Sequence, residues 1–139
     1  MAIELKTLSA GLLRTLTTAT TVVFQPGGSI LYAAPNPADF PAVGATKAAL
    51  VTKMAFFNRN PVGAAAVTIN VYFVRFDASK GGALRPKRRI LPVNLSLVSG
   101  QVVTDQVPLT LEPGDAILGD TTQINVIDFA INGFERLVV

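Results

Sequence analysis

Apolar and polar residues alternate along much of this chain with a period of two. The segments "VTINVYF" (Val67–Phe73) and "LPVNLSL" (Leu91–Leu97) each keep their apolar residues in one phase. Because successive side chains of a β-strand point to opposite faces, each segment predicts a strand with one face in the core. The core positions expected on this basis are Val67, Ile69, Val71, Phe73, Leu91, Val93, Leu95, Leu97, Leu109 and Leu111.

The rest of the chain has the same β character. No segment sustains the 3.6-residue period and the end caps of an amphipathic helix. Further strands are expected at Ile3–Lys6, Leu12–Thr18, Thr21–Gln25, Ser29–Ala33, Ala48–Asn58, Val107–Leu111, Ala116–Leu118 and Gln123–Val138, the last as one strand or as two joined at Asn132-Gly133.

Turn residues separate these short strands at regular intervals. In Pro113-Gly114, proline suits the first central position of a turn and glycine accepts positive φ at the second, which predicts a type II turn. Two longer connections are expected, at Ala34–Lys47 and Asp77–Arg89. The pattern predicts an all-β fold, an antiparallel β-sandwich or jelly roll, with residues 24–139 as one domain and residues 1–23 as an N-terminal extended arm or edge strands.

Two strands are apolar in both phases. In "VYFV" (Val71–Val74) and "INVIDFAI" (Ile124–Ile131), few polar residues are left for a solvated face. We therefore expect both faces to be buried, by another sheet, by an arm or by a second subunit.

Size and hydropathy favour one domain that associates with other subunits. The chain has 139 residues, which suffice for one hydrophobic core. Half of the residues are hydrophobic, only 15% are charged, and the mean hydropathy is +0.46. Part of the apolar surface is expected to lie in contacts between copies, so a homo-oligomer is predicted.

Composition also argues against most enzyme classes. The chain contains neither cysteine nor histidine, which removes thiol catalysis, disulfides, the commonest metal ligand and the commonest general base. We expect no catalytic, cofactor-binding or metal-binding residues, and no enzyme activity. The N-terminal "MAIELK" does not resemble a signal peptide and no segment resembles a membrane-spanning helix, so synthesis in a cytoplasm without a membrane partner is expected.

Three carboxylates flank the predicted Pro113-Gly114 turn and are the first candidate site. Glu112, Asp115 and Asp120 could form a glycosidase pair or a hard-oxygen metal site, but "EPGDAILGD" lacks the spacing of a calcium loop. The preferred interpretation is a solvated corner of the sheet, whose acids keep strand ends soluble.

Charge divides the chain into a basic and an acidic part. Residues 1–89 hold eleven bases and three acids, a net of +8, whereas residues 90–139 hold one base and six acids, a net of −5. The two parts either occupy different surfaces, which would let neighbouring copies meet with opposite charge, or interleave within the fold and cancel.

The run "RPKRR" is the most basic stretch and the second candidate site. Its bases Arg85, Lys87, Arg88 and Arg89 could dock on an acidic protein surface, bind phosphates, or form a solvated loop. Specific nucleic-acid binding is disfavoured because no aromatic residues for base stacking lie among them. We interpret these four residues as a docking element for a protein partner.

Three segments resemble the small β-sandwich accessory structural proteins of tailed bacteriophage virions, of the capsid decoration or cement type. They are "SILYAAP" (Ser29–Pro35), "ALVTKMAFFNRNPVGAAAVTINVYFV" (Ala49–Val74) and "LTLEPGDAILGDTTQINVIDFAINGFE" (Leu109–Glu135). They are similar to a "Y-x-x-P" start, a strand ending in Asn, a strand of the "A-x-T-V-x-V" type, an "L-x-x-G-D" turn and a closing "I-x-G-x-E" strand. These motifs are structural and carry no chemistry.

The resemblance implies a non-enzymatic virion protein, without cofactors, that binds the major capsid protein or another virion protein as an oligomer, with a trimer as the first expectation. The chain would be made in the host cytoplasm and end in the virion. An alternative is a minor head or tail fibre module that binds a host surface ligand. Aromatic platforms for a glycan would favour the alternative, but the chain has no Trp and only Tyr32 and Tyr72.

Overall fold

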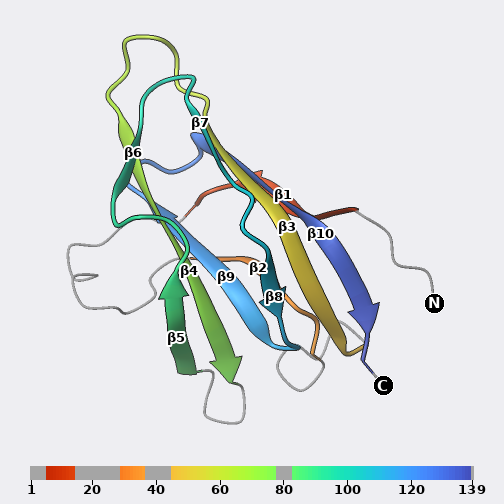
Figure 1. Ribbon diagram of the computed structural model, residues 1–139. Coiled ribbons are helices and arrows are strands. Elements are labelled where there is room, and N and C mark those ends of the chain that lie inside the picture. The colour runs from red at the N-terminus through yellow and green to blue at the C-terminus, as the bar shows by residue number, and fades with distance from the viewer. Residues whose placement is uncertain (1–5, 15–28, 37–44, 78–82, 139) are drawn as a thin grey trace.

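The computed structural model describes residues 6–14, 29–36, 45–77 and 83–138, with side chains except at 29, 76–77 and 83–88. Within these residues the chain forms strands and no helix, as the period of two predicts (Figure 1). The strands are β1 (Lys6–Leu12), β2 (Ser29–Ala33), β3 (Lys47–Asn58), β4 (Val67–Asp77), β5 (Ala83–Arg89), β6 (Leu95–Leu97), β7 (Val102–Asp105), β8 (Leu109–Leu111), β9 (Asp115–Thr121) and β10 (Ile127–Leu137).

The strands form two antiparallel sheets. Sheet A has the order β1-β10-β3-β7, with β8 also paired to β3, and sheet B has the order β2-β9-β4-β5, with β6 also paired to β4. Because β5 and β6 both pair with β4, they can be counted as one interrupted strand, and β7 and β8, which both pair with β3, as another. With the strands renumbered along the chain on this basis, the order is 1-8-3-6 in sheet A and 2-7-4-5 in sheet B. This is the strand order of a jelly roll, so the predicted all-β sandwich is confirmed.

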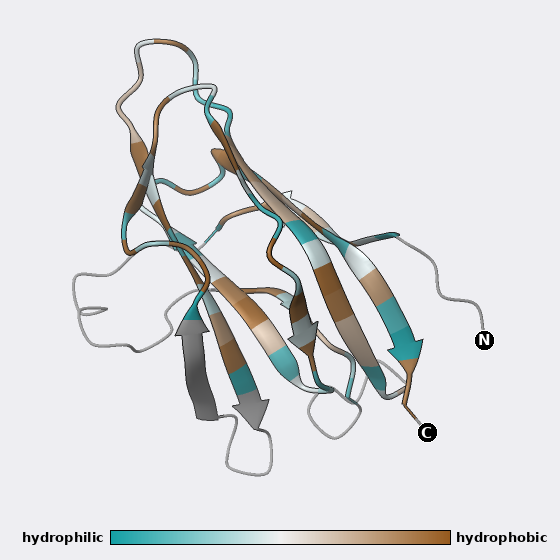
Figure 2. Cartoon of the chain, viewed as in Figure 1, coloured by the Kyte–Doolittle hydropathy of each residue, from teal (hydrophilic) through white to brown (hydrophobic). Residues whose placement is uncertain are grey.

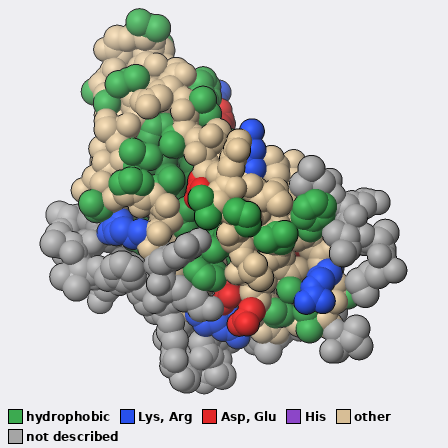
Figure 3. Space-filling model, in the orientation of Figure 1, with side chains coloured by type: hydrophobic (Ala, Val, Ile, Leu, Met, Phe, Trp, Pro, Cys, Tyr) green, Lys and Arg blue, Asp and Glu red, His purple; other side chains and the backbone are tan. Residues whose placement is uncertain are grey.

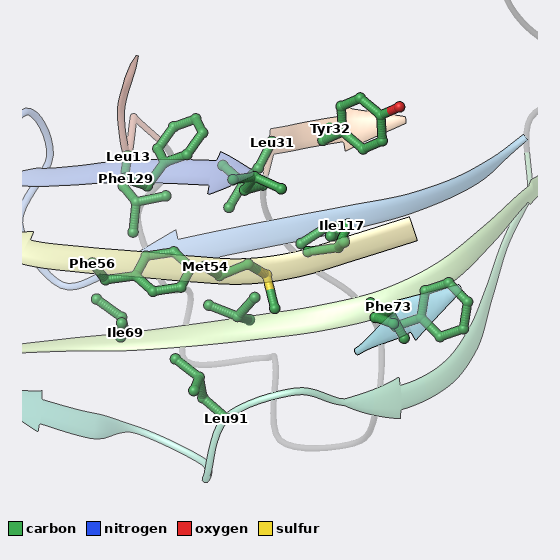
Figure 4. Packing of buried hydrophobic residues seen from close by; sticks show 14 of the residues in the cluster. Leu13, Leu31, Tyr32, Met54, Phe56, Ile69, Phe73, Leu91, Ile117 and Phe129 are labelled. Atoms are coloured by element: carbon green, nitrogen blue, oxygen red, sulfur yellow. The ribbon is translucent and has the colours of Figure 1, made fainter. Parts of the chain in front are cut away.

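The hydrophobic core lies between the two sheets (Figure 4). Phe56 and Met54 of β3 meet Ile69 of β4 and Ile117 of β9 there, all with at most 1% of their surface exposed. The hydropathy colouring shows apolar residues, interrupted by polar ones, along the strands that enclose this core (Figure 2). Of the ten expected core positions, eight are buried, Leu95 is half-buried against the core, and Val93 is wrong, with 59% exposed.

Burial on both faces is confirmed for one of the two segments that predicted it. Val71, Tyr72, Phe73 and Val74 of β4 are all buried. Tyr72 and Val74 form a second cluster with residues of β9, on the face of sheet B that points away from sheet A. For Ile124–Ile131, buried and half-buried residues alternate along β10 and Ile124 is 42% exposed, so this chain covers one face only partly, and burial of that face by a second subunit stays a prediction.

Several strand boundaries differ from those expected. The chain forms β1 at Lys6–Leu12, across the gap between two predicted strands, and β7 at Val102–Asp105, where none was predicted. The predicted strand Leu91–Leu97 shortens to β6. The expected connection Asp77–Arg89 contains β5, which pairs with β4. Strongly basic and uncharged polar stretches lack the local apolar pattern, and pairing with a neighbour makes them strands instead.

The predicted type II turn is present. Gly114 has φ of 87°, and the N–H of Asp115 donates to the carbonyl oxygen of Glu112 at 2.9 Å, which closes the turn.

The predicted arm or edge-strand segment, residues 1–23, is described in part. Lys6–Leu12 lies at the edge of sheet A, where β1 pairs with β10. Residues 1–5 and 15–23 lie outside the described residues. The Ala34–Lys47 connection is likewise described only at its ends, at residues 34–36 and 45–47.

Candidate functional site

The three carboxylates do not form one site. Glu112 is exposed, as the solvated corner predicts, but Asp115 and Asp120 are 1% and 0% exposed, so the prediction of solvated side chains is wrong for both. Asp115 and Asp120 are five residues apart on β9, which pairs with β4 without a register shift. An odd spacing places two side chains on opposite faces of a strand, so these two acids cannot act as a pair.

Asp115 belongs to the turn and its neighbouring strand. Its carboxylate accepts the N–H of Glu112 at 3.0 Å and lies 3.7 Å from the guanidinium of Arg75, its cross-strand partner on β4. Arg75 also donates to the carbonyl of Pro113. These bonds fix the Pro113-Gly114 turn against β4, which is a structural role.

Asp120 belongs to a buried polar cluster centred on Asn70, which is only 2% exposed. The Asn70 side-chain amide donates to Asp120 Oδ1 at 2.9 Å and to Asn94 Oδ1 at 3.0 Å. Asn70 Oδ1 accepts the backbone N–H of Asn94 at 2.8 Å and a guanidinium N–H of Arg89 at 3.0 Å. One side chain of β4 therefore ties together β9, the end of β5 and the turn before β6.

Tyr72 and Arg89 complete this Asn70 cluster. The Arg89 guanidinium stacks 4.7 Å from the centroid of the Tyr72 ring. Burial, followed by the charge of Asp120, raises the pKa of Tyr72, and Arg89 partly opposes this shift. Tyr72 is thus held neutral within the cluster.

The four predicted docking residues lie on one strand, and the side chain of one of them, Arg89, makes contacts within the fold. Arg85, Lys87, Arg88 and Arg89 all lie on β5, but the side chains of the first three lie outside the described residues. Arg89, at the end of the strand, is engaged by Tyr72 and Asn70. Sequence reasoning missed this internal role because the partners of Arg89 come from β4, which is adjacent only in the folded sheet.

The basic and acidic parts of the chain interleave in the fold. Each sheet contains strands from both parts, and described ion pairs join one part to the other. Lys6 lies 2.5 Å from Glu135, Arg75 pairs with Asp115, and Arg59 lies 3.9 Å from Asp128. In Figure 3, charged side chains are scattered among hydrophobic and other side chains of the face shown. Of the two expectations for the charge division, the interleaved one holds for these pairs.

A second polar cluster connects the two sheets at one end of the sandwich. The hydroxyl of Tyr32 on β2 donates to Glu135 Oε2 on β10 at 2.7 Å, and Lys6 on β1 pairs with the other carboxylate oxygen. Burial and the hydrogen bond to Glu135 raise the pKa of Tyr32 well above its usual range. Burial alone would raise the pKa of Glu135, but hydrogen bonds from Lys6 and Tyr32 and the charges of Lys6 and Lys47 lower it overall.

This lowered pKa predicts an acid-sensitive contribution to stability. Glu135 stabilises the fold above its ordinary pKa of 4.5, and this contribution is lost as pH falls through the lower pKa of the folded state. The difference in unfolding free energy between the wild type and Glu135→Gln should therefore shrink as pH falls below about 4. Urea unfolding at several pH values measures it, with the exposed Glu112→Gln as control. A difference that is constant with pH would contradict the prediction.

An open groove of about 310 Å³ lies on the outer face of sheet A. Leu50, Thr110, Phe134 and Arg136 line it, together with Ala48, Ala49 and Glu135. The lining offers mainly apolar contact, with the exposed guanidinium of Arg136 beside it. Nothing in this arrangement resembles an acid–base pair or a nucleophile with its base.

The described residues contain no group of three or more acidic, histidine or cysteine side chains that could hold a metal ion. None of them forms a helix long and apolar enough to cross a membrane. Comparison of the chain with protein-family models, with curated proteins and with solved structures found no match.

Proposed function

We propose that this chain is a non-enzymatic structural protein of a tailed-phage particle that decorates the capsid and holds coat subunits together. The observation that carries the proposal is the jelly-roll strand order, an architecture that viral coat proteins share. Because one fold serves many functions, this support is an analogy at the level of the fold. It agrees with the resemblance of the sequence to decoration proteins.

The segments that carry the resemblance lie together in the structure. Ala34, within "SILYAAP", donates its N–H to the carbonyl oxygen of Asp115 and accepts the N–H of Gly114, both at 2.9 Å. The "Y-x-x-P" and "L-x-x-G-D" patterns thus meet at one end of sheet B. Motifs of this kind preserve strand ends and turns, which is what a structural protein requires.

The alternative, a module that binds a host glycan, is less well supported. Glycan platforms need exposed aromatic rings. Tyr32 is 8% exposed and donates to Glu135, and Tyr72 is 2% exposed and is stacked by Arg89. Phe57, at 39%, is a single exposed ring among the described residues, with no polar group of its own. Decoration needs no such platform. A decorating protein stabilises a shell because its binding free energy must be lost before the bridged coat subunits separate, and several copies multiply this effect.

We also propose that β5 docks on an acidic coat surface through Arg85, Lys87 and Arg88. Arg89 stands at the end of the same basic run but serves the Asn70 cluster. Charged residues at a protein interface mainly speed encounter and fix register, and their effect weakens with salt because charges are screened beyond about 8 Å at physiological ionic strength.

The experiment adds purified protein to undecorated heads of the phage that encodes it. We expect binding, a higher temperature of head disruption, and slower attachment for the triple variant in which Arg85, Lys87 and Arg88 become Ala. The matched control instead replaces Arg14, Lys53 and Arg136 by Ala; these three bases are exposed and lie outside β5, and their loss changes the net charge by the same amount.

Light scattering of heads during heating and surface plasmon resonance at several salt concentrations give the two readouts. If the wild type neither binds nor stabilises the heads, decoration is refuted. If it binds and both triple variants attach equally fast, decoration stands but docking through β5 does not.

A further inference from the structure

The sandwich has two sides at which the sheets end. On one side lie β7 and β8 of sheet A with β5 and β6 of sheet B, and on the other lie β1 and β2. An edge strand exposes backbone N–H and C=O groups that can pair with another chain, and proteins commonly block such edges. The two sides of this molecule differ in how they are blocked.

The side of β5 to β8 carries several blocking features. Strands β6, β7 and β8 have only 3, 4 and 3 residues. Strand β5 contains Pro86 between Arg85 and Lys87, and its pairing with β4 shifts in register between Phe73 and Val74. Short strands, charges, prolines and bulges all hinder pairing with a further strand.

Strands β1 and β2 carry fewer of these features, although each has one register shift, between Thr7 and Ser9 in β1 and between Ile30 and Tyr32 in β2. From Thr7 to Leu12, β1 contains no charged residue and no proline, and β2, Ser29–Ala33, contains none either. The one charged residue of β1, Lys6, lies at its end and is paired with Glu135. Ile30 of β2 is 42% exposed.

The backbone of β1 shows which groups are available. Leu13, directly after β1, donates its N–H to the carbonyl oxygen of Ile127 at 2.9 Å. Because N–H groups alternate in direction along an antiparallel strand, those of Leu12 and Ala10 point away from β10. On the other side of β10, Arg59 donates to Val126, which fits the same alternation. No described strand pairs with this edge of β1.

We propose that β1 is the interface for a second copy of this chain, whose β1 pairs with it in antiparallel orientation and extends sheet A across a twofold axis. A strand without internal charges can face itself without like-charge repulsion. With the axis near Ser9, Lys6 of each copy lies beside the uncharged Leu12 of the other, so the contact is self-complementary.

This inference concerns the free protein and does not depend on capsid binding. It differs from the trimer implied by the resemblance, because an antiparallel pair of identical strands closes with two copies.

The test replaces Ala10 by proline, which removes an outward N–H while leaving the β1–β10 hydrogen bonds in place. Ala10→Val is the matched control, since it adds side-chain bulk and keeps the N–H. Ala10→Lys supplies a second blocking variant that uses charge, because Ala10 is exposed. Thermal unfolding confirms that each variant is folded.

Sedimentation velocity over a range of concentrations should show a wild-type dimer and an Ala10→Val dimer. Both blocking variants should weaken dimerisation by about tenfold or more, which corresponds to about 1.4 kcal/mol. Hydrogen exchange should show the Leu12 amide protected in the wild-type dimer and exposed on dilution. A wild type that stays monomeric with an unprotected Leu12 amide, or blocking variants that dimerise as the wild type does, would overturn the proposal.

Discussion

Replacing Gly133 by alanine is expected to lower the free energy of unfolding by about 3 kcal/mol or more, because the added methyl group has no room. A Cβ at this position would overlap the carbonyl oxygen of Leu50 and lie 3.0 Å from the Cα of Val51. These are backbone atoms of the neighbouring strand β3, which cannot move aside as a flexible side chain can. The pairing of β3 and β10 would have to change instead.

Gly133 lies where the register between β10 and β3 shifts, so that Asn132 pairs with Lys53 but Gly133 pairs with Val51. The extra residue, Thr52, donates from its hydroxyl to the carbonyl of Asn132 at 3.3 Å. The bulge brings the two backbones close together, and glycine is what permits it. Gly133 thus allows β10 to continue as one strand rather than the two considered possible from the sequence.

Urea unfolding of Gly133→Ala measures the loss, with Gly11→Ala on β1 as the matched control. A Cβ at Gly11 would lie 3.5 Å from the Phe129 ring, an ordinary contact, so that variant should be neutral or slightly stabilised. Equal effects of the two substitutions would show that the close approach at Gly133 is not decisive.

Replacing Asn70 by alanine is the second change with a large expected effect, again about 3 kcal/mol. The substitution removes hydrogen bonds to Asp120, Asn94 and Arg89 at once, in a cluster where Asn70 and Asp120 are almost fully buried. Removing a hydrogen-bond donor from a buried carboxylate lowers the stability of the fold far more than removing one from a solvated carboxylate, which water can satisfy. The turn before β6 should also loosen, because Asn94 loses its anchor.

Chemical denaturation measures the stability, and hydrogen exchange of the Asn94 amide measures the loosening. Asn60→Ala is the matched control, since its side chain makes an exposed hydrogen bond to Gln123 at 3.0 Å. Its loss should cost well under about 1 kcal/mol. An Asn70→Ala protein as stable as Asn60→Ala would show that the cluster does not hold β4, β5 and β9 together.

The fold class follows from the sequence because it depends on local alternation. The inward residues of β4, such as Val67 and Ile69, are buried, and Pro113-Gly114 forms the expected type II turn. A side chain's face depends only on its position along the strand, and a turn depends on the φ preferences of two residues. Such features need no knowledge of distant segments.

The candidate site was less predictable. Asp115 and Asp120 resemble solvated turn acids in the sequence, yet both are buried, because β9 lies between β2 and β4 in the interior of sheet B. Arg89 resembles part of a basic loop, yet it stacks on Tyr72 and bonds to Asn70. Nothing in the sequence near Glu135 indicates that its carboxylate contacts Tyr32 and Lys6, because both residues lie at least 103 positions away along the chain.

The sequence by itself therefore determined that this protein is an all-β sandwich with its apolar phase turned inward, because periodicity and turn chemistry act within a few residues. Only the tertiary structure decided the strand order, the central place of β9, the strand at the basic run and the two polar clusters. Each of these depends on which segments pair across the sheets. That choice is made by the sum of packing and hydrogen bonding over the whole chain, so no short stretch of sequence specifies it.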